Sequence, residues 1–176
     1  MKRTTIVFAL LLEFLLSITL TGCANSKIQV YDSLDESVVD YLKIVQGDIP
    51  EDLCLTIYYI RPYIATRRPL SVEDLKNFTD VNRIIVESEG LAAHSELLRK
   101  LDPSRLQPAT GESYIDARMY YVFEAGDDKL LEIIIGNGGV FVNGFSVEFH
   151  PILCELIAPF LPEDAREDWI SYAIFN

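Results

Sequence analysis

Residues 114–149, YIDARMYYVFEAGDDKLLEIIIGNGGVFVNGFSVEF, set the architecture of this chain. The apolar runs in this stretch have strand length and are rich in β-branched and aromatic side chains, which favour extended backbone. Asn137-Gly138 and Asn143-Gly144 separate the later runs. Asn-Gly is the preferred pair for the type I′ turn of a two-residue hairpin, because both positions need positive φ. We therefore expect an antiparallel meander from about Tyr114 to Phe149.

The first run of the meander, residues 114–124, alternates in polarity. One set of side chains is apolar and the other is largely polar, which is typical of a strand with one buried and one exposed face. The expected buried set is Ile115, Ala117, Met119, Tyr121 and Phe123, and the expected exposed set is Asp116, Arg118, Tyr120 and Glu124. Asp116 and Arg118 would then be a cross-strand ion-pair feature of the exposed face.

Helix signals and further strand-like runs lie on both sides of the meander. Ser33 and Glu36 have the spacing of a capping box, Gly47 has the place of a helix C-cap, and Ser71 with Asp74 predicts a second helix start. Together with the apolar periodicity, these signals predict helices at 33–47, from 71, at 89–103, at 151–161 and at 162–175, and strands at 53–61 and 82–88. The expected fold is α+β, an antiparallel sheet that includes the C-terminal-half meander, with amphipathic helices packed mainly on one face.

The first 23 residues have the features of an export signal. The start is cationic, and residues 6–20 form an apolar run interrupted only by Glu13. The Leu20-Thr21-Gly22-Cys23 segment resembles the lipobox of bacterial lipoproteins, whose cysteine becomes the lipidated N-terminus. The resemblance implies a signal peptide at 1–22 and a lipidated cysteine and spacer at 23–30. The length and composition of the chain predict a single α+β domain at 31–176. The alternative is an uncleaved anchor helix, although a spanning helix needs about 20 apolar residues.

A lipidated Cys23 implies both a location and a first partner. The expected location is the outer face of the bacterial cytoplasmic membrane, or the outer membrane where the host has two membranes. A single acyl chain binds a membrane only marginally, whereas several chains, palmitate among them, hold a protein stably. The membrane is therefore the expected partner of the N-terminus, reached through the lipid.

The charge of the chain restricts the other partners. The formal net charge is −12, with 27 acidic residues against 15 Lys and Arg. Nucleic acid is excluded as a partner, because phosphate backbones are bound by clustered cations. The acidic surface either keeps the protein soluble or attracts a basic partner.

The chain has few residues for catalysis or for binding a metal. It contains two histidines, His94 and His150, and no His or Cys pair has zinc-ligand spacing. No nucleophile elbow or phosphate loop is present, so no cofactor is expected. Cys54 and Cys154 are expected to be buried free thiols, because cysteine is among the most buried residue types. An exported protein also permits a disulfide between them.

Residues 58–70, YYIRPYIATRRPL, are the one cationic and aromatic segment of the acidic chain. Arginine beside aromatic rings is the usual equipment for recognising carboxylates, phosphates or a protein surface. The candidate binding patch consists of Arg61, Arg67, Arg68, Tyr58 and Tyr63. The alternative is that these arginines pair with carboxylates of the same domain.

Four segments together resemble a family of small, uncharacterised lipoproteins of Gram-positive bacteria. These are TIYYIRPYIATRRPLSVEDL at 56–75, YIDARMYYVFE at 114–124, VFVNG at 140–144 and PFLPED at 159–164. The resemblance implies no activity and no site residue beyond the lipidated cysteine.

The leading functional hypothesis is a lipid-anchored, non-enzymatic binding or accessory module that recognises a protein or an envelope component. A second hypothesis is an inhibitor or immunity-type lipoprotein whose acidic surface meets a basic partner. A third is a small envelope enzyme with a polar site of Arg67, Arg68, Asp116 and Glu124, which would require a pocket that joins these groups.

The lipobox interpretation predicts the outcome of one substitution. Cys23→Ala removes the only atom to which the lipid can be attached, so the variant should be left unprocessed or released from membranes. Fractionation and gel mobility of the full chain test this expectation. Recovery of Cys23→Ala in membranes at the processed size would contradict it.

Overall fold

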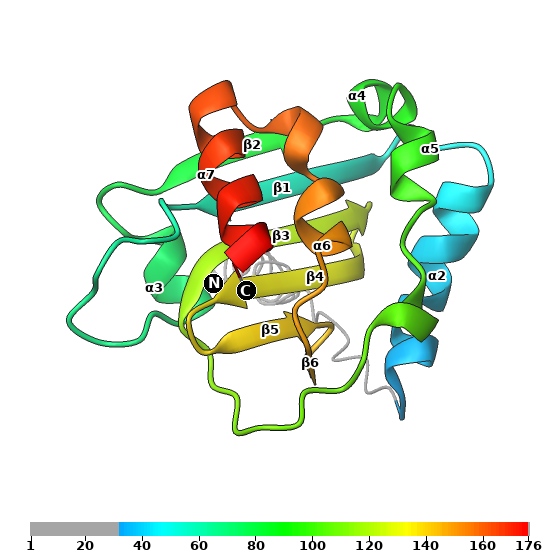
Figure 1. The fold of residues 1–176 in the computed structure, drawn as a ribbon. Coiled ribbons are helices and arrows are strands. Elements are labelled where there is room, and N and C mark those ends of the chain that lie inside the picture. The colour runs from blue at the N-terminus through cyan, green and yellow to red at the C-terminus, as the bar shows by residue number, and fades with distance from the viewer. Residues whose placement is uncertain (1–31, 176) are drawn as a thin grey trace, which may run out of the picture.

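The computed structural model describes residues 32–175, so the predicted signal peptide and Cys23 lie outside the described residues. The fold is α+β, with one six-stranded antiparallel sheet in the order β2-β1-β3-β4-β5-β6 (Figure 1). The strands are β1 (Leu53–Tyr59), β2 (Asn82–Val86), β3 (Ala117–Ala125), β4 (Asp128–Gly136), β5 (Gly139–Val142) and β6 (Phe145–Val147). The strands predicted at 53–61 and 82–88 and the meander are confirmed.

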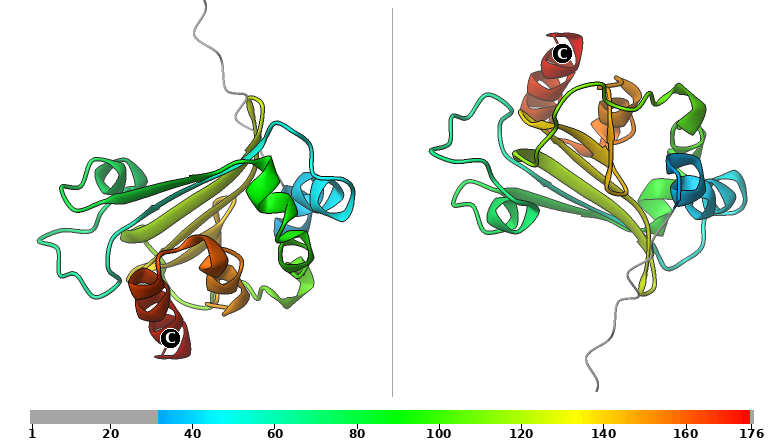
Figure 2. Two further views of the ribbon diagram at one scale, coloured as in Figure 1. Left: turned by 90° about the horizontal axis from the view of Figure 1, so that it is seen from above. Right: turned by 90° about the horizontal axis from the view of Figure 1, so that it is seen from below.

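The helices cover the two faces of the sheet unequally (Figure 2). The helices of one face are α2 (Leu34–Gln46), α4 (Ser88–Ala92), α5 (Ser95–Leu98), α6 (Ile152–Glu155) and α7 (Glu163–Phe175), with the short 3₁₀ turns η1 (Pro103–Arg105) and η2 (Ala158–Phe160). Their buried side chains form the larger core with the facing side chains of the strands. Among the helices of residues 32–175, only α3 (Val72–Lys76) lies on the opposite face, over a smaller cluster that contains Leu75 and Tyr120. The prediction of helices mainly on one face is confirmed.

The two Asn-Gly hairpins use glycine for different reasons. At Asn143-Gly144 both residues have positive φ, 47° and 85°, as expected of a type I′ turn. Neither Asn137 nor Gly138 has positive φ, so the type I′ prediction is wrong at this hairpin. Gly138 is required there for space, because a Cβ atom would overlap the carbonyl oxygen of Tyr114.

The prediction of one exposed face on β3 is wrong. Tyr120 and Val122 are buried in the cluster beneath α3, and Asp116 and Arg118 are 8% and 2% exposed. The Asp116–Arg118 ion pair exists, but it is buried and joins two residues of one chain segment rather than neighbouring strands. One cause is the second layer, since α3 and the segment before it cover a face that alternation alone marks as polar. The predicted buried set is also wrong in part, because Ile115 is 43% exposed and a register shift between Ala117 and Met119 puts Ala117 in the cluster beneath α3.

The predicted helix at 89–103 is divided into α4 and α5, with Ala93 and His94 between them. Gly90 and Ser95 lower the helix propensity of this segment. Each short helix still buries one leucine in the core, Leu91 in α4 and Leu98 in α5. The helix predicted at 151–161 is likewise divided, into α6 and η2.

Cys54 and Cys154 are free thiols on opposite faces of the sheet. Cys54 alternates along β1 with Leu53 and Leu55 of the larger core, so its side chain lies on the α3 face and is half-buried. Cys154 belongs to the larger core, and burial raises the pKa of its thiol to about 12.

Both thiols should therefore resist oxidation to a disulfide. We expect alkylation in denaturant without reductant to label both Cys54 and Cys154, and alkylation of the folded protein to leave Cys154 unlabelled, because a buried thiol of raised pKa supplies almost no thiolate. Peptide mass spectrometry measures both results. A peptide pair joined through Cys54 and Cys154 would contradict the prediction.

Candidate functional site

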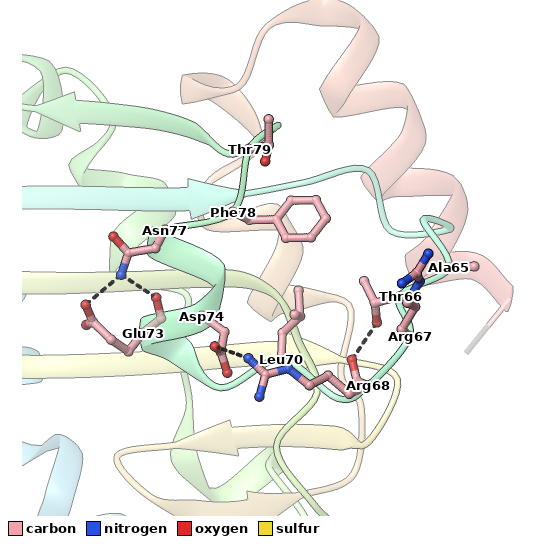
Figure 3. Close-up of a pocket in the computed structure, with 10 residues that line it drawn as sticks. All are labelled: Ala65, Thr66, Arg67, Arg68, Leu70, Glu73, Asp74, Asn77, Phe78 and Thr79. Atoms are coloured by element: carbon pink, nitrogen blue, oxygen red, sulfur yellow. Dashed lines mark hydrogen bonds and ion pairs between the residues drawn. The ribbon is translucent and has the colours of Figure 1, made fainter.

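A groove of about 510 Å³ lies between α3 and the preceding loop, residues 61–70 (Figure 3). We call it the α3 groove. Its lining residues come from the loop, from α3 and from the segment that follows the helix: Ala65, Thr66, Arg67, Arg68, Leu70, Glu73, Asp74, Asn77, Phe78 and Thr79. The two adjacent arginines of the predicted patch therefore lie in a concave site, beside the apolar side chains of Leu70 and Phe78 (Figure 3).

The two arginines of the groove differ in their partners. Arg68 forms an ion pair with Asp74, with 2.9 Å between Nη2 and Oδ1. Arg67 is exposed and forms no hydrogen bond or ion pair with any residue of the described part of the chain. Arg67 thus presents a planar cation with five donors to solvent at the groove, in a protein with a large acidic excess.

The helix that forms one wall of the groove is short but well capped. The hydroxyl of Ser71 accepts from the N–H of Asp74 at 3.0 Å, and the Asp74 carboxylate accepts from the N–H of Ser71 at 3.2 Å. Hydrogen bonds from the Ser71 side chain and backbone, with the nearby Arg68 charge, lower the pKa of Asp74. The capping box confirms the predicted helix start, and Leu70 and Leu75 are buried on either side of it.

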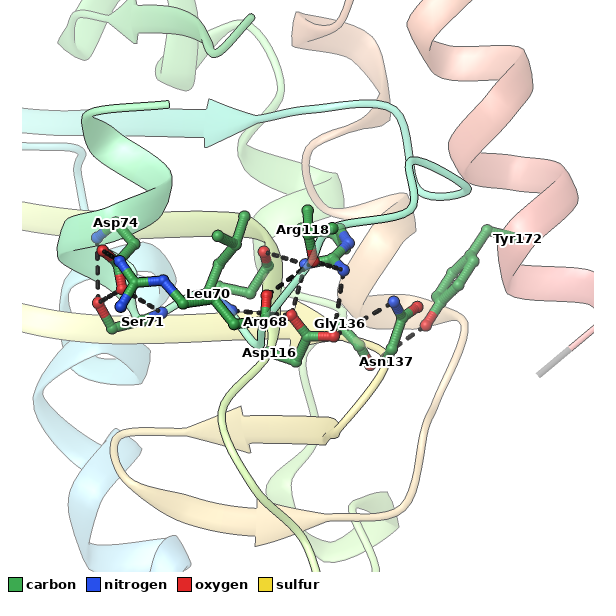
Figure 4. Close-up of polar contacts among 11 residues, drawn as sticks. Arg68, Leu70, Ser71, Asp74, Asp116, Arg118, Gly136, Asn137 and Tyr172 are labelled. Atoms are coloured by element: carbon green, nitrogen blue, oxygen red, sulfur yellow. Dashed lines mark hydrogen bonds and ion pairs between the residues drawn. The ribbon is translucent and has the colours of Figure 1, made fainter. Parts of the chain in front are cut away.

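The loop wall of the groove is held by a buried polar network (Figure 4). Arg118 binds Asp116 with two hydrogen bonds, Nη1 to Oδ1 at 2.6 Å and Nη2 to Oδ2 at 3.1 Å. Asp116 Oδ1 also accepts from the N–H of Leu70 at 2.9 Å, and Arg118 Nη2 donates to the hydroxyl of Thr66 at 2.9 Å. That hydroxyl donates to the carbonyl of Arg68 at 2.8 Å. The ion pair therefore fixes the loop on both sides of the groove arginines.

The other members of the predicted patch do not line the groove. Tyr58 lies on the sheet against Tyr120, with ring centroids 6.2 Å apart and with Lys76 and Arg83 over its ring. Arg61 pairs with Asp168 of α7 at 3.7 Å, and the ring of Tyr63 lies 6.2 Å from that of Tyr172 in the same helix. The structure brings together Arg67 and Arg68 and separates them from Tyr58, Arg61 and Tyr63.

The four residues that the enzyme hypothesis requires do not line one pocket: Arg67 and Arg68 line the groove, but Asp116 and Glu124 do not. Asp116 is 8% exposed, and its carboxylate already accepts hydrogen bonds from Arg118, the N–H of Leu70 and Asn137. Glu124 is near the other end of β3, opposite Lys129 of β4. Neither carboxylate lines the groove that contains Arg67 and Arg68.

The histidines lie elsewhere. His94 is exposed and packs edge-on against Phe160, and His150 Nδ1 accepts from the N–H of Ile152 at 3.2 Å. Within residues 32–175 no group of three or more His, Cys, Asp or Glu side chains has an arrangement that could hold a metal ion.

No helix in the same range is long and apolar enough to cross a membrane.

Comparisons of the chain with protein-family models, with curated proteins and with solved structures found no match. A function is therefore inferred from the geometry and charge of the α3 groove.

Two features of the site do not follow from the sequence pattern. Glu73, Asn77, Phe78 and Thr79 complete the groove only because α3 packs beside the loop, and no motif in these residues indicates a site. The role of Asp116 and Arg118 had one usable signal, which is that strict alternation would place these two opposite charges on one strand face with Tyr120 and Val122. In the structure, a register shift between Ala117 and Met119 breaks this alternation. An apolar pair on the same face favours burial of that face over exposure.

The buried ion pair should be essential for stability. We expect Asp116→Ala to lower the free energy of unfolding by about 3–5 kcal/mol, because Arg118 would be left buried without its counter-charge. Urea denaturation measures the change, and Asp128→Ala, at an exposed acid of β4, is the matched control with an expected change within about 0.5 kcal/mol. Equal effects of the two substitutions would show that the ion pair is not the source of the stabilisation.

Proposed function

We propose that the protein is a lipid-anchored, extracytoplasmic binding module that uses the α3 groove to hold an anionic group of a protein or envelope partner. The observation that carries the proposal is Arg67, an exposed guanidinium without a partner among residues 32–175, in a mainly polar groove that also contains the apolar side chains of Leu70 and Phe78. A guanidinium binds carboxylate or phosphate oxygens with two parallel hydrogen bonds, which gives both energy and orientation.

Arg68 adds a second cation at small energetic cost. Its side chain is 75% exposed and that of Asp74 is 34% exposed, and an ion pair this exposed contributes about 0–1 kcal/mol. A ligand carboxylate can therefore replace Asp74 as the partner of Arg68. The surrounding acidic surface opposes nonspecific binding of anions, which favours a ligand that fits between the two arginines and the ring of Phe78.

The proposed anchor and the groove are compatible in space. The described chain begins just before α2, and α2 lies at the end of the sheet opposite to α3 and its preceding loop in Figures 1 and 2. The nine Cα–Cα steps from Cys23 to Asp32 span at most about 30 Å when fully extended. A tether at this end would hold the domain near the membrane and leave the groove directed away from it.

A basic partner is the second candidate, and one observation favours it. The first two turns of α7 contain Glu163, Asp164, Glu167 and Asp168, and the first three of these are exposed. A cluster of this kind attracts a cationic surface, and binding through it would be strongly salt-dependent.

A pull-down with cross-linking and mass spectrometry separates the two candidates. The bait is the chain from Ala24 to Asn176, which retains every residue of both core clusters. We expect Arg67→Glu to lose the specific partner, because the cation that binds it becomes an anion. The matched control is Arg105→Glu, which makes the same charge change at an exposed position outside the groove.

Each outcome has a distinct meaning. A partner kept by Arg105→Glu and lost by Arg67→Glu supports the groove. A partner kept by Arg67→Glu and released at moderate salt supports the acidic surface, and the proposal for the groove would then be wrong.

A further inference from the structure

The two edges of the sheet differ in whether another segment of the described chain covers them. At the β6 edge, Pro108 forms a bridge with Val147, the N–H of Ala109 donates to Ser146 at 3.1 Å, and the N–H of Glu148 donates to Gln107 at 2.8 Å. The chain thus covers this edge with its own segment. At the other edge, the described residues make no backbone hydrogen bond to β2 from any strand except β1, and Figure 1 shows β2 at the rim of the sheet.

The β2 edge lacks most of the features that prevent edges from pairing. It contains no proline, and its register with β1 runs without a shift from Asn82 to Val86. Ile85 is 52% exposed. Open and regular edges pair with other strands unless charges, bulges or covering segments prevent it, and the one charged residue within β2 is Arg83.

The exposed side chains of this edge are complementary to those of an identical edge in antiparallel orientation. Arg83, Ile85 and Glu87 alternate along the strand direction, and all three are exposed. Arg83 lies over the ring of Tyr58, which places this set on the α3 face of the sheet. Glu87 has an extended backbone, with φ −80° and ψ 168°, so the strand geometry continues through it.

We propose that β2 pairs antiparallel with β2 of a second copy of this chain, about a two-fold axis at Ile85. This register places Ile85 opposite its own counterpart and Arg83 opposite Glu87 of the other copy, twice. The two six-stranded sheets then become one continuous sheet.

The charges at Arg83 and Glu87 favour a second copy of this chain as the partner of β2, and they favour antiparallel over parallel pairing. A parallel arrangement in register would place Arg83 beside Arg83 and Glu87 beside Glu87, and directly opposed like charges destabilise a sheet. The pairing is short, so the dimer is expected to be weak and to depend on concentration. The inference concerns a different surface from the α3 groove and does not depend on the function proposed for that groove.

Disulfide trapping in the full chain tests the contact. Residues directly opposite in an antiparallel pair have Cα atoms about 4.5–5.5 Å apart, which is within the range that a disulfide spans. We expect Ile85→Cys to give a covalent dimer under mild oxidation of membranes that contain the protein. The controls are Ile174→Cys, at a position that is 73% exposed on α7, and the unsubstituted chain with its native cysteines.

Charge reversal tests the register. Arg83→Glu places like charges opposite each other at two positions, and we expect dimerisation of the Ile85→Cys chain to weaken by about tenfold. Adding Glu87→Arg restores the opposite charges and should restore the dimer. Thermal unfolding of each variant shows that the fold is retained.

Three results would overturn the proposal. These are equal cross-linking of Ile85→Cys and Ile174→Cys, no effect of Arg83→Glu on the dimer, and cross-linking of Ile85→Cys to a different protein only. The last result would assign the β2 edge to an unrelated strand rather than to a second copy.

Discussion

The buried pair of Asp116 and Arg118 is the interaction on which the candidate site depends. Every other polar contact of residues 66–70 with the sheet passes through it or lies beside it, including the hydrogen bond from the N–H of Ala117 to Leu70 at 2.8 Å. Burying two charges is favourable only when their remaining donors and acceptors are satisfied. The loop provides two of those partners, the N–H of Leu70 and the hydroxyl of Thr66, and the Ala117 carbonyl and Asn137 provide the others, although Arg118 Nε has none in the described structure. The ion pair and the groove loop therefore stabilise each other.

Local signals in the sequence were sufficient to predict the framework. The helix starts at Ser33 and Ser71 and the turn at Asn143-Gly144 are set by hydrogen bonds and φ angles within four residues, so the sequence pattern contains them. The α+β class follows from these elements, because an antiparallel sheet with helices has few stable arrangements.

The parts that sequence reasoning missed all depend on contacts between distant segments. Burial of both faces of β3 requires α3, a helix of five residues that lies some forty positions earlier in the chain. The predicted patch was divided for a related reason, because residues that are close in sequence contact different elements. Tyr58 lies on the sheet, Arg61 and Tyr63 contact α7, and Arg67 and Arg68 line the groove. Composition identified the segment, but only packing could select the two arginines that share a cavity.

Helix α3 and the open edge meet at Tyr58. Lys76, at the end of α3, lies 5.6 Å from the centre of this ring, and the guanidinium of Arg83 in β2 lies 5.5 Å from it. Pairing of two β2 strands about an axis perpendicular to the sheet keeps equivalent faces on the same side, since Arg83 and Glu87 must meet on one face. Both α3 grooves of a dimer would then open on that face, and the larger helical layers would lie together on the other. Two weak sites held on one surface bind a divalent or repeating partner far more tightly than either site alone, because the second contact becomes intramolecular.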